Sequence, residues 1–97
     1  RKIADTTNIS EINSLRAEFA DRFGTLPPTV ERLFKITELR ITAFENNIQY
    51  IEVRDGKVMF MRNNQYIKQN SRFPRLKANT VDKRLDAMLD LVRSFPQ

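Results

Sequence analysis

Two amphipathic segments of the chain are separated by the sequence Asp21-Arg22-Phe23-Gly24-Thr25-Leu26-Pro27-Pro28. Gly24 suits the left-handed backbone that ends many helices. Proline has a fixed φ and no N–H, so it interrupts a helix but is well placed at a helix start. This stretch therefore predicts that one helix stops at Phe23 and that a second begins at Pro28.

The segment before this connector, from about Ser10 to Phe23, repeats its apolar residues at helical spacing. Asn8 or Ser10 is expected to cap its first turn, with Glu11 in the position that a capping box requires. Residues 1–7 read as the end of a preceding helix.

The segment after the connector, 28–46, predicts a longer helix with two adjacent apolar stripes. The stripes are Val30, Leu33, Phe34, Ile41 and Phe44, and beside them Ile36, Leu39 and Ala43. So wide an apolar arc is typical of a helix packed on more than one side, and we expect this helix to be the central element. Asn47 can take the left-handed position that ends it.

Two β-rich runs follow, Ile48 to Arg54 and Lys57 to Arg62, and Asp55-Gly56 between them is a strong signal for a two-residue hairpin turn. An isolated hairpin is barely stable, so it must pack on a helix or pair with a third strand. That strand is expected around Tyr66-Ile67 or Arg72-Phe73.

The last helix is expected to start after Asn79 or Thr80, either of which can cap it, and to carry Asp82 in its first turn. Its buried stripe is expected at Val81, Leu85, Met88, Leu89, Val92 and Phe95. The predicted fold class is α+β, with three main helices packed with a small antiparallel β-hairpin or three-stranded sheet.

The composition excludes much chemistry. The chain has 97 residues, enough for a single domain, and no His, Cys or Trp. Disulfides, thiolate nucleophiles, Cys/His zinc sites and histidine-based catalytic triads are therefore impossible. No catalytic, cofactor or metal site is predicted. No apolar run is long enough to span a membrane, and no signal peptide is visible. Because the chain starts at Arg1 without Met, we expect a fragment cut from a longer protein, and the missing Cys fits an intracellular location.

The positive charge is local. Residues 1–47 are balanced, whereas residues 48–97 carry ten basic and five acidic residues, the whole of the net charge of +5. The segment 62–79 has no acid, and its cations are Arg62, Lys68, Arg72, Arg75 and Lys77. With Tyr66 and Phe73 interleaved, this segment could bind single-stranded nucleic acid. The alternative is a solvated loop whose two aromatic residues pack on the core.

Three carboxylates, Asp82, Asp86 and Asp90, share one face of the last predicted helix. A solvated face, near the basic segment, is favoured over a metal site, because a hard cation would need further oxygen ligands that no motif supplies.

The stretch from Glu11 to Val58 carries a longer signature. It contains Ile12-x-x-Leu15-x-x-Glu18, Asp21-Arg22-Phe23-Gly24-x-Leu26-Pro27, Leu33-Phe34, Leu39-Arg40 and Ile48-x-x-Ile51-Glu52. This signature resembles the C-terminal domain of the bacterial transcription-repair coupling factor. Residues 1–97 would then be one regulatory domain of a larger protein, itself without catalytic activity.

The resemblance implies a role that composition does not show. Such a parent is an ATP-dependent DNA translocase that removes stalled RNA polymerase and recruits nucleotide excision repair in the cytoplasm, with ATP and magnesium bound by its motor domains. The domain would dock on the N-terminal excinuclease-B-like module of the same chain and mask the surface that recruits excinuclease A. Our candidates for the docking contacts surround the hairpin: Glu52, Arg54, Asp55 and Arg62.

Overall fold

The computed structural model describes residue 3, residues 6–69 and residues 71–95. Its elements follow the chain as α1 (Ile9–Phe23), α2 (Pro28–Glu45), β1 (Tyr50–Arg54), β2 (Lys57–Arg62), β3 (Gln65–Tyr66) and α3 (Val81–Ser94). The three helices and the sheet confirm the predicted α+β class. Most of the helix end expected in residues 1–7 lies outside the described residues.

The helix boundaries follow local sequence signals. The backbone N–H of Glu11 donates to Asn8 Oδ1 at 2.8 Å, and that of Lys83 donates to Thr80 Oγ1 at 3.2 Å, so Asn8 and Thr80 are the caps. Gly24 ends α1 with a φ of 74°. The predictions of both caps and of the helix break are confirmed.

The strands form one antiparallel sheet in the order β1-β2-β3. The turn between β1 and β2 has positive φ at both Asp55 (51°) and Gly56 (76°), as the hairpin signal predicts. The turn into β3 uses Asn63 and Asn64, also with positive φ. The third strand is therefore the one near Tyr66, and the alternative at Arg72-Phe73 is wrong.

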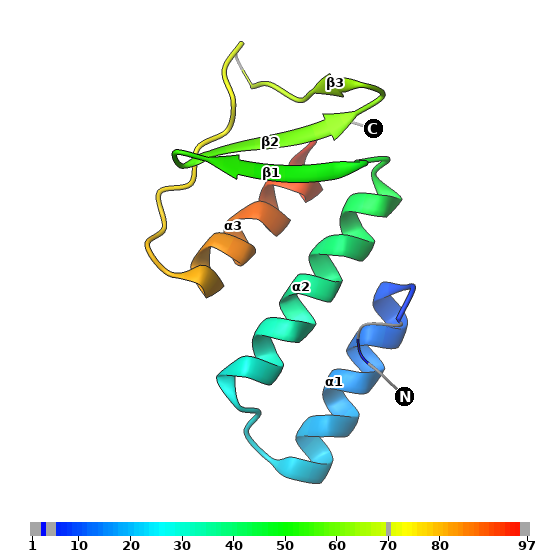
Figure 1. The fold of residues 1–97 in the computed structure, drawn as a ribbon. Coiled ribbons are helices and arrows are strands. Elements are labelled where there is room, and N and C mark those ends of the chain that lie inside the picture. The colour runs from blue at the N-terminus through cyan, green and yellow to red at the C-terminus, as the bar shows by residue number, and fades with distance from the viewer. Residues whose placement is uncertain (1–2, 4–5, 70, 96–97) are drawn as a thin grey trace.

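After β3 the chain returns to the sheet and pairs with the part of β2 that β3 does not reach. Val58 N–H donates to Pro74 O at 2.8 Å, and Leu76 N–H donates to Gly56 O at 2.7 Å. Residues 74–76 thus lie beside the start of β2, while β3 pairs with its end. In Figure 1 this segment passes the turn end of the hairpin on its way to α3.

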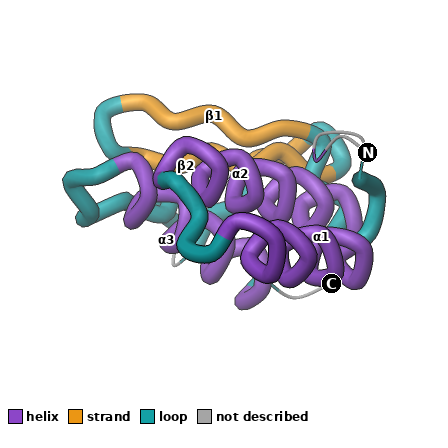
Figure 2. Tube along the Cα trace, turned by 90° about the horizontal axis from the view of Figure 1, so that it is seen from below, coloured by secondary structure: helices purple, strands orange, loops and turns teal. Residues whose placement is uncertain are grey.

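The helix α2 lies between α1 and α3, and the sheet packs across the C-terminal ends of α2 and α3 (Figure 1). Seen from below, the strands form one layer and the helices the other (Figure 2). Side chains of α2 contribute to two separate apolar clusters. One joins it to α1 through Phe34 and Ile41, and the other joins it to the sheet and α3 through Leu39 and Ala43. The prediction that α2 is central is confirmed.

The expected apolar stripes are only partly buried. Phe44 is 80% exposed, Ile36 47% and Leu33 40%. The reason is geometric: α1 covers one side of α2, and α3 with the sheet covers another, so a third strip of its wide apolar arc is only partly covered by the described residues. Val81, in the first turn of α3, is also more than half exposed, which corrects its place in the buried stripe.

Candidate docking surface

A shallow apolar groove of about 340 Å³ lies between the C-terminal half of α2 and the strand β1. It is bordered by Phe44 of α2, which is largely exposed, by Ile36 and Tyr50, each somewhat under half exposed, and by the polar residues Arg40 and Gln49. Its floor is formed by residues that also belong to or contact the core: Leu39, Ala43, Ile48 and Ile51. Exposed apolar surface gathered around a hollow is typical of a binding site for another protein.

The strand β1 borders this groove and is an edge of the sheet. It pairs with β2 on one side, and its other side has no strand partner among the described residues. An edge strand presents backbone N–H and C=O groups to a partner, and β1 is short and carries Glu52 and Arg54, two charges that limit unspecific pairing.

Three of the predicted docking residues gather at the turn end of the hairpin. Arg54 Nε donates to Glu52 Oε1 at 2.9 Å, so these two residues form an ion pair on β1. Asp55 follows in the turn and is exposed. They place charged groups at the end of β1 that is farther from the groove, which takes only Tyr50 and Ile51 from this strand.

The fourth predicted residue, Arg62, lies at the opposite end of the hairpin and has a different role. Its Nε donates to the carbonyl oxygen of Asn46 at 3.1 Å. This contact satisfies a carbonyl at the end of α2, where cations are favoured by the helix dipole. Arg62 thus ties the sheet to α2.

Two tyrosines meet on the outer face of the sheet. Tyr50 and Tyr66 both pair with Met61, and their hydroxyl oxygens are 2.8 Å apart. The hydrogen bond between the two hydroxyls raises the pKa of Tyr50 above its ordinary value of 10.0. Phe73 packs edge-on against Tyr66, with 5.8 Å between ring centroids. Both aromatic residues of the basic segment therefore pack against neighbouring rings.

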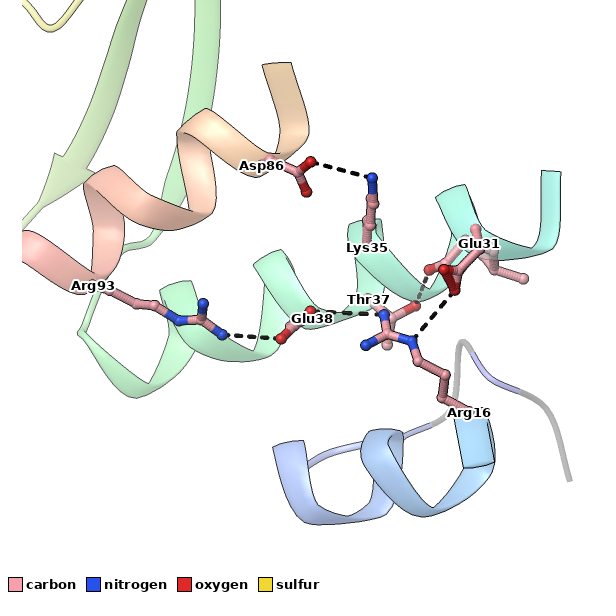
Figure 3. Close-up of polar contacts among 8 residues, drawn as sticks. Arg16, Glu31, Lys35, Thr37, Glu38, Asp86 and Arg93 are labelled. Carbon is pink, nitrogen blue, oxygen red and sulfur yellow. Dashed lines mark hydrogen bonds and ion pairs between the residues drawn. The ribbon is translucent and has the colours of Figure 1, made fainter. Parts of the chain in front are cut away.

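Salt bridges connect the three helices along the polar face of α2 (Figure 3). Glu38 accepts from Arg93 of α3 at 3.0 Å and lies 3.8 Å from Arg16 of α1. Arg16 also pairs with Glu31 at 3.4 Å, and its guanidinium lies over the ring of Phe34 at 5.2 Å. Glu38 is thus the central carboxylate of this network, which sequence spacing did not indicate.

The aspartates of α3 join the same helix-to-helix contacts. Asp82 pairs with Arg32 at 3.2 Å and Asp86 pairs with Lys35 at 3.3 Å. Asp90 borders a separate hollow that Lys77 also lines. Within residues 3, 6–69 and 71–95, no three acidic side chains come together in a way that could hold a metal ion.

Two cations of the predicted nucleic-acid patch, Arg72 and Arg75, line one hollow, whereas Lys77 lines another. Arg72, Phe73 and Arg75 line a space of about 400 Å³ together with Lys57 of β2. Lys68 lies over the Phe73 ring, with its Nζ 5.2 Å from the centroid. Lys57 was missing from the predicted patch because it precedes the segment in sequence and reaches the hollow only through the pairing of β2 with residues 74–76.

None of the helices in the described ranges is long and apolar enough to cross a membrane. The geometry defines a small α+β domain whose described surface offers an apolar groove and charged patches. Residues 1–72 match the family model described as the TRCF domain. The chain belongs to this family, the TRCF domain of transcription-repair coupling factors.

Two curated relatives support this assignment. The chain is 31% identical over 85 residues to a transcription-repair-coupling factor of Bacillus subtilis, covering 71% of this chain and 7% of the relative. It is 36% identical over 52 residues to the one of Haemophilus influenzae, covering 54% of this chain and 4% of the relative. The chain thus spans only a small part of the length of these relatives. No solved structure matches it.

Proposed function

We propose that this chain is a non-catalytic, autoinhibitory docking domain of a transcription-repair coupling factor. Its parent would be a DNA-translocating ATPase that acts on stalled RNA polymerase, with ATP and magnesium bound by other domains. In the resting state this domain would hold the excinuclease-B-like module of the same chain and mask its site for excinuclease A. Release would be a population shift between docked and open states.

The observation that carries this proposal is the apolar groove beside the edge strand β1. Interfaces commonly have an apolar centre with aromatic residues and a polar rim. Phe44 and Tyr50 supply aromatic side chains, Arg40 and Gln49 supply polar groups in the lining, and the charged residues Glu52, Arg54 and Asp55 follow further along the hairpin. This arrangement changes the expected interface from a largely polar one at the hairpin to one centred on α2 and β1.

The test uses the full-length protein that carries this domain. Deletion of the domain is expected to raise ATPase and translocation rates and to increase binding to excinuclease A. If deletion leaves all three unchanged, the domain is not autoinhibitory.

A single substitution locates the surface. Phe44→Asp places a charge in the groove without disturbing the core, because Phe44 is 80% exposed. It is expected to cost about 2 kcal/mol of docking, as for an interface hot spot, and so to activate the protein as deletion does. The matched control is Phe23→Asp, at the far end of α1 and 67% exposed, which should leave the protein inhibited. If both variants behave alike, the groove is not the docking surface.

A further inference from the structure

The proposed docking role does not use the basic hollow, which contains an unfavourable pair of like charges. Lys57 lies directly opposite Arg75 where residues 74–76 run antiparallel to the start of β2. The backbone hydrogen bonds on either side run from Val58 N–H to Pro74 O and from Leu76 N–H to Gly56 O. Lys57 and Arg75 therefore form a non-hydrogen-bonded antiparallel pair, the kind in which opposite side chains lie closest together. Like charges directly opposite each other in such a pair are destabilising.

The neighbouring backbone brings a third cation to the same hollow. Gln69 and Arg72 exchange two backbone hydrogen bonds, of 2.7 and 3.0 Å, across a tight turn in which Ser71 has a φ of 65°. This turn holds Arg72 beside Phe73, and Lys57 and Arg75 complete the lining of the 400 Å³ hollow.

These cations have no carboxylate partners among the described residues. The ion pairs of Arg16, Arg32, Lys35 and Arg93 lie on the helices, and that of Arg54 lies on β1. The cations of the hollow and Lys68 take part in none of them. Several helical cations of the described residues are therefore paired with carboxylates, whereas Lys57, Arg72 and Arg75 concentrate positive charge at this hollow, where an anion would relieve the repulsion.

We propose that this hollow binds the phosphodiester backbone of single-stranded nucleic acid. Lys57, Arg72 and Arg75 would contact phosphates, and the part of the Phe73 ring that lines the hollow, beside its contacts with Lys68 and Tyr66, would contact an unpaired base. The aromatic lining favours nucleic acid over an acidic peptide, because carboxylates would neutralise the cations but make no use of the ring. It favours a single strand because bases in a duplex are already stacked on one another.

The binding test is fluorescence anisotropy of a labelled oligothymidylate titrated with the 97-residue chain at several salt concentrations. Three phosphate contacts predict a slope of log K against log salt of about −2 for a single strand. The double variant Arg72→Gln/Arg75→Gln should lower affinity about tenfold or more at about 50 mM salt and should reduce the slope by about 1.4.

The matched control removes the same charge elsewhere. Arg22→Gln/Lys83→Gln changes two exposed cations on α1 and α3 that have no side-chain ion pair within the described ranges. Its affinity should stay within about threefold of the parent chain, since only a diffuse long-range field is lost. An equal loss in both double variants would overturn the site, because it would mean that net charge alone drives binding.

The variant Lys57→Gln separates a binding role of this lysine from a purely structural one, because the two roles predict different changes in melting temperature and in binding. Removing one of two facing cations should raise the melting temperature of the free chain by about 2–5 °C while weakening oligothymidylate binding. A lower melting temperature would show that the pair is not repulsive and would overturn the proposed site. Absence of oligothymidylate binding at low salt, or tighter binding of polyglutamate or of duplex DNA, would also refute the proposal.

Discussion

Replacing Glu38 with glutamine removes one negative charge from the middle of α2 while keeping the shape of the side chain. The Glu38 side chain is 13% exposed and lies between Arg93 of α3, at 3.0 Å, and Arg16 of α1, at 3.8 Å (Figure 3). The substitution therefore tests whether the network holds the three helices together.

The expected loss is modest because both partners have access to solvent. The Arg93 side chain is 52% exposed and that of Arg16 is 31% exposed, and exposed ion pairs contribute about 0.2–1 kcal/mol each. Arg16 keeps Glu31 as a partner, and glutamine can still accept a hydrogen bond from Arg93. We expect Glu38→Gln to lower the free energy of unfolding by about 1 kcal/mol, which corresponds to about 4–8 °C in a domain of this size.

The assay is urea unfolding followed by far-ultraviolet circular dichroism, since the chain has no Trp. The matched control is Glu18→Gln, which removes an exposed carboxylate of α1 that has no ion pair within the described ranges. A double-mutant cycle of Glu38→Gln with Arg93→Met should give a coupling energy of about 0.5 kcal/mol or more. A loss no larger than that of the control, together with zero coupling, would show that the network adds nothing to stability.

Three further predictions concern the core, the hairpin turn and the tyrosine pair. Phe60→Ala should cost about 3–5 kcal/mol in urea unfolding because Phe60 is fully buried, whereas Phe44→Ala should stay within about 0.5 kcal/mol; equal losses would contradict the burial described. Gly56→Ala should cost about 1–2 kcal/mol because its φ is 76°, and Gly56→Asn, which tolerates positive φ, should cost less than half as much in the same assay. Tyr66→Phe should lower the midpoint of Tyr50 ionisation towards 10.0, read by ultraviolet absorbance. Because the folded pKa of Tyr50 lies above its unfolded value, the stability from this pair is complete below pH 10.0 and is lost as the pH rises through the folded pKa; an unchanged midpoint would mean that the two hydroxyls do not interact.

The candidate surfaces show where sequence reasoning ends. The hairpin charges Glu52, Arg54 and Asp55 were identified because they lie next to a recognisable turn. Helical spacing puts Phe44 in an apolar stripe, but it shows only which residues share a helix face and not which faces find a neighbour.

The sequence by itself determined the ends of the helices and the hairpin, because these depend on backbone preferences within a few residues. Gly24, the two prolines of the connector and Asp55-Gly56 act on φ and on hydrogen bonds nearby in the chain. These signals placed α1, α2, β1 and β2 to within two residues.

Only the tertiary structure decided which surfaces could bind a partner. Glu38 meets Arg93 across 55 positions of sequence, and Lys57 meets Arg75 only because residues 74–76 return to β2. Such pairs depend on how helices and strands pack over long distances in the chain, and no local dihedral preference encodes them. The exposed strip of α2 also depends on packing, because only the assembled fold shows which faces of the helix α1, α3 and the sheet cover.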